Sequence, residues 1–380
     1  MKIIIAPDSY KESLSSLEVA TQIESGFKEV FPDAEYSKVP IADGGEGTVE
    51  ALTAATNGRQ IKVFVTGPLG KKITAFYGVL GDGETAVIEM AASSGLSLIS
   101  PAMRNPLVTT SYGTGELIRN ALDSGYRKFI IGIGGSATND AGTGMLQALG
   151  VKLLDKNKNE IGFGGGAIAQ LNEIDMSGLD ARLNDSQIWV ACDVNNPLTG
   201  ETGASAVFGP QKGATTEMVK TLDGCLAHFA KIAKDTLGLD IAEHPGAGAA
   251  GGMGASLRGF LHAQLLTGVS IVIEHTGLEK MIKDADLVIT GEGRIDSQSV
   301  FGKAPVGIAE IAKSHGVPVV ALAGSFGAGA SDVRQHGIDA IFSIVNTPCS
   351  LDDAIRDAAY NLRSTASNIA ALIQISKQVS

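Results

Sequence analysis

Two stretches at opposite ends of the chain share one alternating pattern, and this pattern restricts the fold more than any other feature. Near the N-terminus, a short apolar run at residues 3–6 and a second strand expected at 35–40 alternate with helix-like segments. The same alternation returns in the last hundred residues, with apolar runs at 286–290, 318–323 and 341–345. Short apolar runs that alternate with helices indicate a parallel sheet covered on both faces. The sequence therefore predicts an α/β fold with one five-stranded, doubly wound sheet built from both ends of the chain.

The middle of the chain follows a different pattern. Residues 61–92 contain several strand-like segments separated by glycine turns, which indicates an antiparallel or mixed sheet. A chain of 380 residues also exceeds the size of an ordinary single domain. We therefore expect residues 1–59 and 284–380 to form the doubly wound domain, and residues 60–283 to form an inserted second α/β domain. Ligand sites favour domain boundaries, so we expect the active site in the cleft between the two.

Composition argues against several classes of partner. The net charge is −11, with no basic run of the kind that nucleic-acid binding requires, so no nucleic-acid partner is expected. The apolar start is too short for a signal peptide, and no apolar run approaches the ~20 residues of a membrane span. The three cysteines form no pair with metal-ligand spacing, which favours a reducing compartment. We expect a cytoplasmic protein with no membrane partner, and a homo-oligomer stays open.

A glycine-rich segment follows the apolar run at 128–133 and precedes a helix. Backbone amides in such a loop can hold a phosphate, and neighbouring hydroxyl groups add donors. The alternative is a tight turn whose polar side chains only cap the helix. The candidates for binding nucleotide phosphate are Gly134, Gly135 and Ser136, and those for binding substrate are Asn139 and Asp140.

Two further glycine-rich segments have both a functional and a structural interpretation. Residues 245–256 form a small-residue loop that opens a helix expected over 251–266, and its candidates for nucleotide binding are Gly248, Gly251 and Gly252. The alternative is close helix packing through small residues. Asp43 begins the other segment, residues 43–47, where the alternative is an ordinary helix cap. Neither segment is a Walker P-loop, and no dinucleotide-binding fingerprint follows the first strand.

Charged and polar side chains follow three of the predicted strands. In open parallel sheets, ligands bind at the carboxyl ends of the strands. A lysine there can neutralise a transferring phosphoryl group, and carboxylates with amides suit magnesium and a polyhydroxy substrate. The segments concerned contain Asp8, Ser9 and Lys11 after the first strand, Asp193 and Asn195 after the strand at 187–192, and Glu292, Arg294 and Asp296 after the strand at 286–290.

This set of groups fits phosphoryl transfer, which needs positive charge and amides around the phosphate, a magnesium ion and a carboxylate near the acceptor hydroxyl. A nucleophilic triad fits poorly, because the sequence has no Gly-x-Ser-x-Gly elbow. Two alternatives stay open. One is a dehydrogenase acting on hydroxy acids, and the other is a sugar-acid binding protein without turnover.

Five segments, taken in order, resemble the bacterial class I glycerate kinases of the glycerate 2-kinase type. They are residues 6–13, 42–48, 134–140, 192–198 and 291–296. The resemblance implies ATP and D-glycerate as substrates, Mg2+ as cofactor and 2-phosphoglycerate as product. It also implies a flavodoxin-like domain interrupted by a second α/β domain, in agreement with the pattern above.

The resemblance allows roles to be set out as a hypothesis. Lys11 and Arg294 stabilise the transferring phosphoryl group, and Asp193 or Asp296 is the base or a magnesium ligand, with Glu292 as a second metal candidate. The glycine-rich loops at 134–135 and 246–254 hold the nucleotide phosphates. The glycerate pocket is assigned to Asp8, Ser9, Asp43, Asn139, Asp140 and Asn195.

Overall fold

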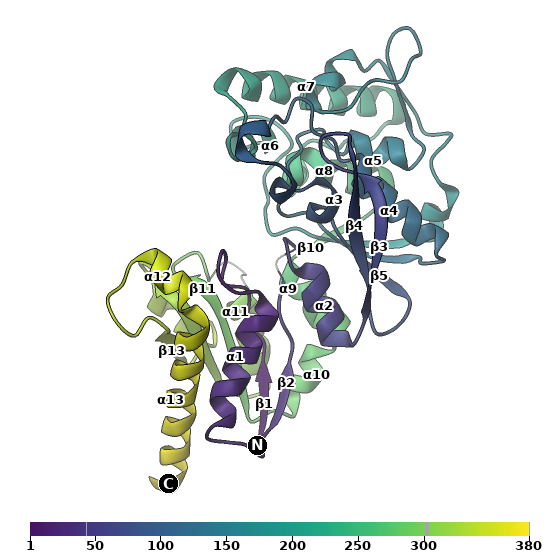
Figure 1. The fold of residues 1–380 in the computed structure, drawn as a ribbon. Coiled ribbons are helices and arrows are strands. Elements are labelled where there is room, and N and C mark those ends of the chain that lie inside the picture. The colour runs from purple at the N-terminus through teal and green to yellow at the C-terminus, as the bar shows by residue number, and fades with distance from the viewer. Residues whose placement is uncertain (43, 301–303, 380) are drawn as a thin grey trace. The chain divides into compact units, whose positions relative to one another are not determined.

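The computed structural model describes residues 1–42, 44–300 and 304–379, and it shows a mixed α/β protein made of two compact units (Figure 1). Unit 1 contains Met1–Asp43, Glu50–Asn57 and Gly268–Ser380. Unit 2 contains Gly44–Val49 and Gly58–Thr267. Each unit has its own sheet and its own hydrophobic core, and the two are described separately.

The sheet of unit 1 has five parallel strands, as predicted. They are β1 (Lys2–Ile5), β2 (Glu35–Lys38), β11 (Leu287–Ile295), β12 (Val319–Phe326) and β13 (Ala340–Ser343). Their order in the sheet is β13-β12-β11-β1-β2, with every neighbouring pair parallel. Counted within this unit alone, the order is 2-1-3-4-5, which is the flavodoxin-like arrangement. The prediction that the two ends of the chain form one doubly wound sheet is therefore confirmed.

Helices cover both faces of this sheet. On one face, α1 (Ser16–Lys28) packs along α13 (Ala358–Val379), and their apolar side chains share a core with Ile3 and Ile5 of β1. Gly26 permits this close approach, since a Cβ atom there would lie 2.4 Å from the carbonyl oxygen of Arg363. The helix α11 (Ala304–Ser314) lies on the other face, against β11 and β12.

The structure places the second boundary of unit 1 earlier in the chain than residue 284. The helices α9 (Gly268–Thr276) and α10 (Leu278–Lys283) pack against α11 and so belong to unit 1. Gly307 of α11 faces Val269 of α9, where an added Cβ atom would approach the valine methyl groups to 3.2 Å. The apolar residues of these two helices are thus buried by the doubly wound domain.

The expectation that β11 ends at Thr290 and leads into a loop is wrong. The strand continues to Ile295, because its backbone stays paired with β12 up to the pair Ile295–Phe326. Gly291 lets the two strands approach, since a Cβ atom at this position would lie 2.2 Å from the carbonyl oxygen of Leu322. Glycine and charged residues have low strand propensity, and tertiary pairing overrides it here.

Unit 2 contains a six-stranded mixed sheet, as the pattern of residues 61–92 predicts. Its strands are β3 (Arg59–Thr66), β4 (Lys72–Val79), β5 (Thr85–Glu89), β6 (Lys128–Gly132), β9 (Gln187–Ala191) and β10 (Gln264–Leu266), in the order β10-β9-β6-β5-β4-β3. The four strands from β10 to β5 run parallel, whereas β3 and β4 are antiparallel to their neighbours. A separate two-stranded sheet joins β7 (Lys152–Leu154) to β8 (Glu173–Asp175).

The helices of unit 2 include one that departs from expectation. Its described helices are α3 (Ala91–Ser94), α4 (Tyr112–Asp123), α5 (Thr143–Ala148), α6 (Ala204–Phe208), α7 (Thr216–Leu237) and α8 (Ala249–Leu261), and α2 (Thr48–Thr56) spans the boundary between the units. The helix expected over 251–266 ends at Leu261, because His262 takes a left-handed conformation. Residues 264–266 then pair with β9 as β10. No helix in the described part of the chain is long and apolar enough to span a membrane.

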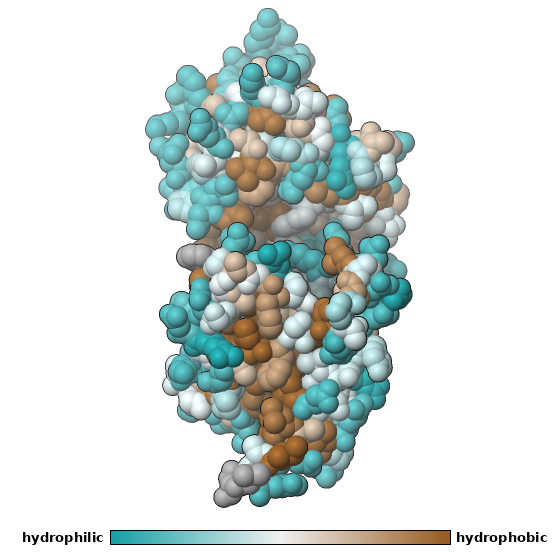
Figure 2. Space-filling view, turned by 90° about the vertical axis from the view of Figure 1, so that its left-hand side faces the viewer, coloured by the Kyte–Doolittle hydropathy of each residue, from teal (hydrophilic) through white to brown (hydrophobic). Residues whose placement is uncertain are grey.

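Hydrophobic side chains reach the surface of unit 1 in one region. Figure 2 shows hydrophobic side chains gathered along the face that leads to the C-terminus, and α13 exposes Leu372 and Ile375.

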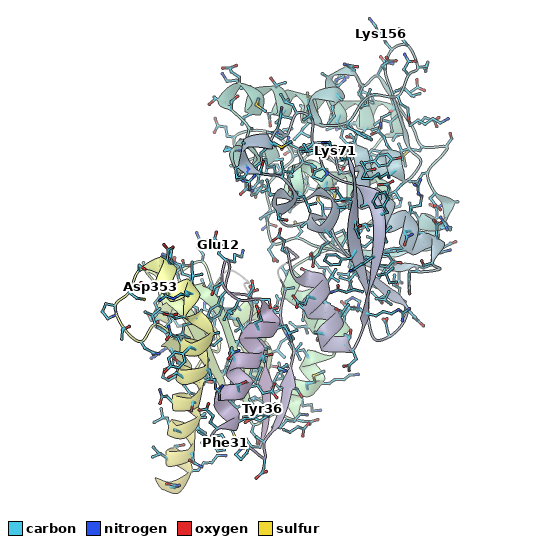
Figure 3. The ribbon with its side chains drawn as sticks, in the orientation of Figure 1. Glu12, Phe31, Tyr36, Lys71, Lys156 and Asp353 are labelled. Carbon is cyan, nitrogen blue, oxygen red and sulfur yellow. The ribbon has the colours of Figure 1, made fainter. Side chains whose placement is uncertain are left out.

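In Figure 3, Glu12 and Asp353 lie at one end of the unit 1 sheet, and Phe31 and Tyr36 lie at the other. Glu12 directly follows Lys11. The end of the sheet near Glu12 is therefore the end at which β1 leads into the candidate site residues.

Candidate functional site

In unit 1, the segments that follow β1 and end β11 lie side by side. The backbone N–H of Asp8 donates to the carbonyl oxygen of Gly291 over 2.8 Å. An added Cβ atom on Gly293 would lie 3.5 Å from the Cα atom of Tyr10 and 3.6 Å from the backbone nitrogen of Lys11. The parallel pairing of β1 with β11 brings these segments to one edge of the sheet. We name residues 8–11 and 291–296 together the unit 1 cluster.

Arg294 presents an exposed positive charge in this cluster. Its Nε atom lies 3.2 Å from Oδ2 of Asp296, and the arginine side chain is 66% exposed while that of Asp296 is 19% exposed. Gly327 of the neighbouring chain segment leaves room for this pair, since a Cβ atom there would lie 2.9 Å from Nη2 of Arg294. An ion pair this exposed contributes little to stability, so the guanidinium group is suited to bind an anion instead.

Glu292 and Tyr10 lie deeper in the unit 1 cluster. Glu292 is buried and accepts a hydrogen bond from the Ser299 hydroxyl over 2.5 Å. Tyr10 donates its hydroxyl to the carbonyl oxygen of Leu322 over 3.0 Å. Burial, and then the charge of Glu292, raise the pKa of Tyr10 far above its ordinary value, so its phenol stays neutral. Tyr10 therefore serves to anchor the segment that carries Asp8, Ser9 and Lys11.

In unit 2, four of the segments that were singled out from the sequence converge. The Gly134 N–H donates to the carbonyl oxygen of Gly44 over 2.9 Å, which joins the glycine turn after residue 43 to the loop after β6. The other contacts that join these segments are Ala141 N–H to the Gly251 carbonyl (2.9 Å) and Gly248 N–H to the Asn196 carbonyl (2.9 Å). We name residues 44–47, 134–142, 192–198 and 245–252 together the unit 2 cluster. Asp43 lies outside the described residues.

Close packing accounts for the glycines of the 245–252 segment. Gly251 has φ +69°, and a Cβ atom there would lie 2.1 Å from the carbonyl oxygen of Thr138. The corresponding distances are 2.8 Å from Gly252 to Cδ1 of Leu198 and 2.2 Å from Gly248 to the carbonyl oxygen of Pro197. These observations favour the alternative of backbone packing for this segment, and phosphate binding by Gly248, Gly251 and Gly252 stays a prediction.

The buried carboxylate of Asp140 holds the 134–140 loop in place through hydrogen bonds. Its carboxylate is fully buried and accepts hydrogen bonds from the N–H and hydroxyl of Ser111, at 2.9 and 2.8 Å. It also accepts from the N–H groups of Gly142 and Gly144, at 3.2 and 3.4 Å. Burial raises the pKa of Asp140, while these hydrogen bonds act in the opposite direction. The contacts describe a structural carboxylate at the start of α5, and its contact with substrate stays a prediction.

Two polar atoms beside Asp140 are buried and have no hydrogen-bond partner among the described residues. Asn139 donates from Nδ2 to the Ser205 hydroxyl over 2.9 Å, but its Oδ1 atom accepts no hydrogen bond in the described part of the chain. The same holds there for the hydroxyl oxygen of Thr138. Buried polar groups are normally paired, so such atoms mark a place where a ligand or water completes the bonding. This supports the candidacy of the 134–140 loop as a binding site.

The structure adds a residue that the sequence interpretation missed. Lys212 is 1% exposed, and its Nζ atom donates to Oγ of Ser136 over 2.7 Å and to the carbonyl oxygen of Thr138 over 2.6 Å. Burial lowers the pKa of Lys212 to about 7, and the nearby charge of Asp140 acts in the opposite direction. Lys212 follows Pro210 in a short segment without any motif, so only the fold reveals the contact.

This lysine should make the stability of unit 2 depend on pH. Between about pH 7 and its ordinary pKa of 10.5, the unfolded chain binds a proton at Lys212 that the folded chain does not, so stability rises with pH. We expect the free energy of unfolding to contain a gain of about 2 kcal/mol between pH 7 and pH 9 that Lys212→Met removes. Urea unfolding followed by the fluorescence of Trp189, the single tryptophan, measures it. An equal pH dependence in both proteins would contradict this assignment.

Asp193 and Asn195 follow β9 and are exposed at the carboxyl end of the unit 2 sheet. Their neighbour Asn196 is held in place, since its Nδ2 atom donates to the Thr202 carbonyl over 2.8 Å. β9 lies next to β6, so Asp193 leaves the sheet at the same edge as the 134–140 loop. This placement agrees with a role in binding substrate or metal, which stays a prediction.

The candidate carboxylates of Asp193 and Glu292 are suited to hold a magnesium ion only when a phosphorylated ligand supplies further oxygen ligands. Among the described residues, no group of three histidine, cysteine, aspartate or glutamate side chains is placed to hold a metal. Magnesium in kinases takes most of its ligands from phosphates and water and needs only one or two carboxylates. Asp193, two residues after β9, and Glu292, within the last part of β11, each fit the part of such a single ligand.

Comparisons with known proteins agree with this chemistry. The glycerate kinase family model matches residues 3–374. The chain is 59% identical over 375 residues to the glycerate 2-kinase of Escherichia coli K12, with 99% of this chain and 98% of that protein covered. It is also 59% identical over 377 residues to the glycerate kinase of Bacillus subtilis 168, with 99% of each protein covered.

A solved structure supports the same relationship. A crystal structure from Salmonella typhimurium LT2, described as that of a candidate glycerate kinase 2, superposes with a TM-score of 0.90 at 57% identity. The match covers 100% of this chain and 99% of that one. The chain therefore belongs to the glycerate kinase family.

Proposed function

We propose that this chain transfers the γ-phosphoryl group of ATP to the 2-hydroxyl of D-glycerate and forms 2-phosphoglycerate and ADP. Membership of the glycerate kinase family makes it a phosphotransferase with an alcohol group as acceptor. The observation that carries the proposal is the family match over residues 3–374, which includes every segment of both clusters. The name of the Escherichia coli relative, a glycerate 2-kinase, supports the choice of the 2-hydroxyl.

Each cluster supplies groups that this reaction requires. In unit 1, Lys11 and the exposed Arg294 stabilise the charge of the transferring phosphoryl group. In unit 2, the loop of Gly134, Gly135 and Ser136 holds the phosphates of the nucleotide. Magnesium, when bound between nucleotide phosphates and a carboxylate, neutralises part of the developing charge.

The remaining polar residues belong to the glycerate side of the reaction. We assign Asp8, Ser9, Asn139 and Asn195 to the binding of the hydroxyl and carboxylate groups of glycerate. The base that accepts the proton of the 2-hydroxyl is Asp193 or Asp296. Asp193 follows β9 and Asp296 follows β11, and both strands run parallel to their neighbours, so each aspartate lies at a carboxyl edge where ligands bind in such folds.

We also place the reaction in the cytoplasm. The proposed donor is ATP, and the three cysteines of the chain are free thiols, which is the state that a reducing compartment maintains.

Release of ADP tests the function directly. With Mg-ATP, the purified chain should release ADP at a rate of at least about one per second when D-glycerate is present, and far more slowly when it is omitted. The dehydrogenase alternative predicts reduction of NAD by D-glycerate instead. The binding-protein alternative predicts stabilisation by glycerate with no ADP release. Either result in place of ADP release would remove the proposed function.

A thermal shift gives an independent check on the cofactor. A ligand that binds only the folded protein raises the midpoint of unfolding by mass action. Mg-ATP at about a hundred times its Kd should stabilise the chain by about 2.7 kcal/mol, whereas NADH should not change Tm. A Tm that rises with NADH and not with Mg-ATP would favour the dehydrogenase alternative.

A further inference from the structure

Lys212 is placed unusually for a buried lysine. Two of its three N–H donors bond to the 134–140 loop, to Ser136 Oγ and to the Thr138 carbonyl oxygen. In the described part of the chain, no carboxylate oxygen lies within 4.0 Å of its Nζ atom. A buried charge without a bonded counter-charge is costly, and proteins rarely keep one that has no function. The loop is therefore bonded to a lysine whose charged form an anion would stabilise.

A second cationic side chain lies next to the segment of Lys212. Arg104 donates from Nη1 to the carbonyl oxygen of Gln211 over 3.3 Å. Gly213 packs against Arg104, since a Cβ atom on this glycine would lie 2.5 Å from the arginine carbonyl oxygen. The Nε atom of Arg104 is buried and has no partner among the described residues. Lys212 thus bonds to the loop directly, and Arg104 contacts the segment that carries Lys212.

The loop also contains polar groups that make no hydrogen bond in the described part of the chain. The Thr138 hydroxyl and Asn139 Oδ1 lack partners among the described residues. The hydrogen bonds of the described chain also leave the N–H groups of Ser136 and Thr138 without an acceptor. Amide and hydroxyl donors in front of buried positive charge are the elements of an anion site.

We propose that Lys212 is the positioning residue of the nucleotide-phosphate site, and that it acts through Ser136. The ammonium group donates to Ser136 Oγ, so the hydroxyl proton of Ser136 is left to donate to a phosphate oxygen. The bond to the Thr138 carbonyl fixes the same loop, and the positive charge stands directly behind it. This inference rests on the proposed function, because it takes the anion to be a phosphate of ATP.

A phosphate fits this site better than the carboxylate of glycerate does. Lysine acts on phosphate as a compact point charge, whereas carboxylates are typically bound by the two-pronged guanidinium of arginine. The glycine-rich backbone of the loop also allows close approach to several phosphate oxygens. Binding of the glycerate carboxylate at this site would be a different result, and the calorimetry described below can detect it.

The site should take up a proton when it binds phosphate. The charged group of the loop that acts on Lys212 is Asp140, and Arg104 contacts the neighbouring carbonyl oxygen of Gln211. Without an anion, burial lowers the pKa of Lys212 to about 7, so at pH 8 most of the protein holds a neutral amine. A bound phosphate favours the ammonium form, and binding at pH 8 should therefore draw in roughly one proton.

Isothermal titration calorimetry of the full chain tests the proposal with Mg-ATP and, separately, with D-glycerate. We expect Lys212→Met to weaken Mg-ATP binding about tenfold or more at pH 7 and to change glycerate binding less than about twofold. Ser136→Ala should weaken Mg-ATP binding in the same direction. The double variant should lose no more than Lys212→Met alone, because the two residues act as one unit. The exposed Lys220→Met is the matched control and should bind as the unchanged protein does.

Proton uptake provides a readout that a purely structural role would not alter. Titrations of the unchanged protein at pH 8, in buffers of different ionisation enthalpy, should show the uptake, and Lys212→Met should not. Unchanged Mg-ATP affinity in Lys212→Met, additive losses in the double variant, or a selective loss of glycerate binding would each overturn the proposal. If Lys212→Met fails to fold, the titration of the unchanged protein decides the question. Absence of proton uptake in that titration would overturn the proposal. Binding is measured without turnover, so a failure of this proposal can be told apart from a failure of the proposed function, which ADP release tests separately.

Discussion

Asp193→Asn should lower kcat for glycerate phosphorylation by about 10²-fold or more. The substitution keeps the size of the side chain and removes its charge, whether that charge accepts the hydroxyl proton or holds magnesium. Loss of one such group costs several kcal/mol of transition-state stabilisation. Steady-state kinetics with saturating Mg-ATP and D-glycerate measure the effect. The exposure of Asp193 after β9 means that the fold should tolerate the change.

The same strand offers a matched control. Asp185 is also exposed and lies two residues before β9, whereas Asp193 lies two residues after it. Asp185→Asn removes the same charge at the amino end of the strand and should leave kcat within about twofold, because ligands bind at the carboxyl ends. A near-normal kcat in Asp193→Asn would remove Asp193 from the mechanism and leave Asp296 as the candidate base.

Gly251→Ala should destabilise unit 2 by about 3 kcal/mol or more. Alanine would place its Cβ atom 2.1 Å from the Thr138 carbonyl oxygen and 2.6 Å from the Asn139 Cα atom, both of them backbone atoms. The backbone φ of +69° adds strain for any residue other than glycine. The loop that Lys212 supports would have to move, so we expect weaker Mg-ATP binding as well. Urea unfolding followed by Trp189 fluorescence reports on this unit.

Gly224→Ala is the control for this substitution. Gly224 lies on the exposed side of α7, and an added Cβ atom there meets no atom within 4 Å. Alanine is the better helix former, so the variant should be more stable by about 0.5–1 kcal/mol. A Gly251→Ala protein as stable as the unchanged chain would show that the two loops do not pack as described.

The strands of unit 1 and their assembly from both ends of the chain could be predicted from the sequence because the signals of each strand are local. Apolar runs such as residues 3–6 are fully buried in a parallel sheet, and the helices between them carry their own start signals. Ser15 and Glu18, for example, form a capping box at the start of α1. The motifs that resemble a known family then identified most of the segments that the fold brings to the strand ends.

Other features depend on contacts between distant residues and had no local signal. The extension of β11 beyond Thr290 arises from pairing with β12, and Lys212 meets Ser136 from 76 positions along the chain. Gly251 could be assigned neither to phosphate binding nor to packing until its neighbour Thr138 was known. A glycine shows that something comes close to the backbone, and the sequence alone does not name the neighbour.

The central claim is the transfer of phosphate to the 2-hydroxyl of D-glycerate, and phosphorus NMR of the product tests it most directly. A phosphate on that oxygen couples to one methine proton, whereas a phosphate on the terminal oxygen couples to two methylene protons. After incubation with Mg-ATP and D-glycerate, we expect a new phosphomonoester doublet together with the signals of ADP. A triplet would contradict the assigned hydroxyl, and a spectrum with no new phosphomonoester would contradict the function.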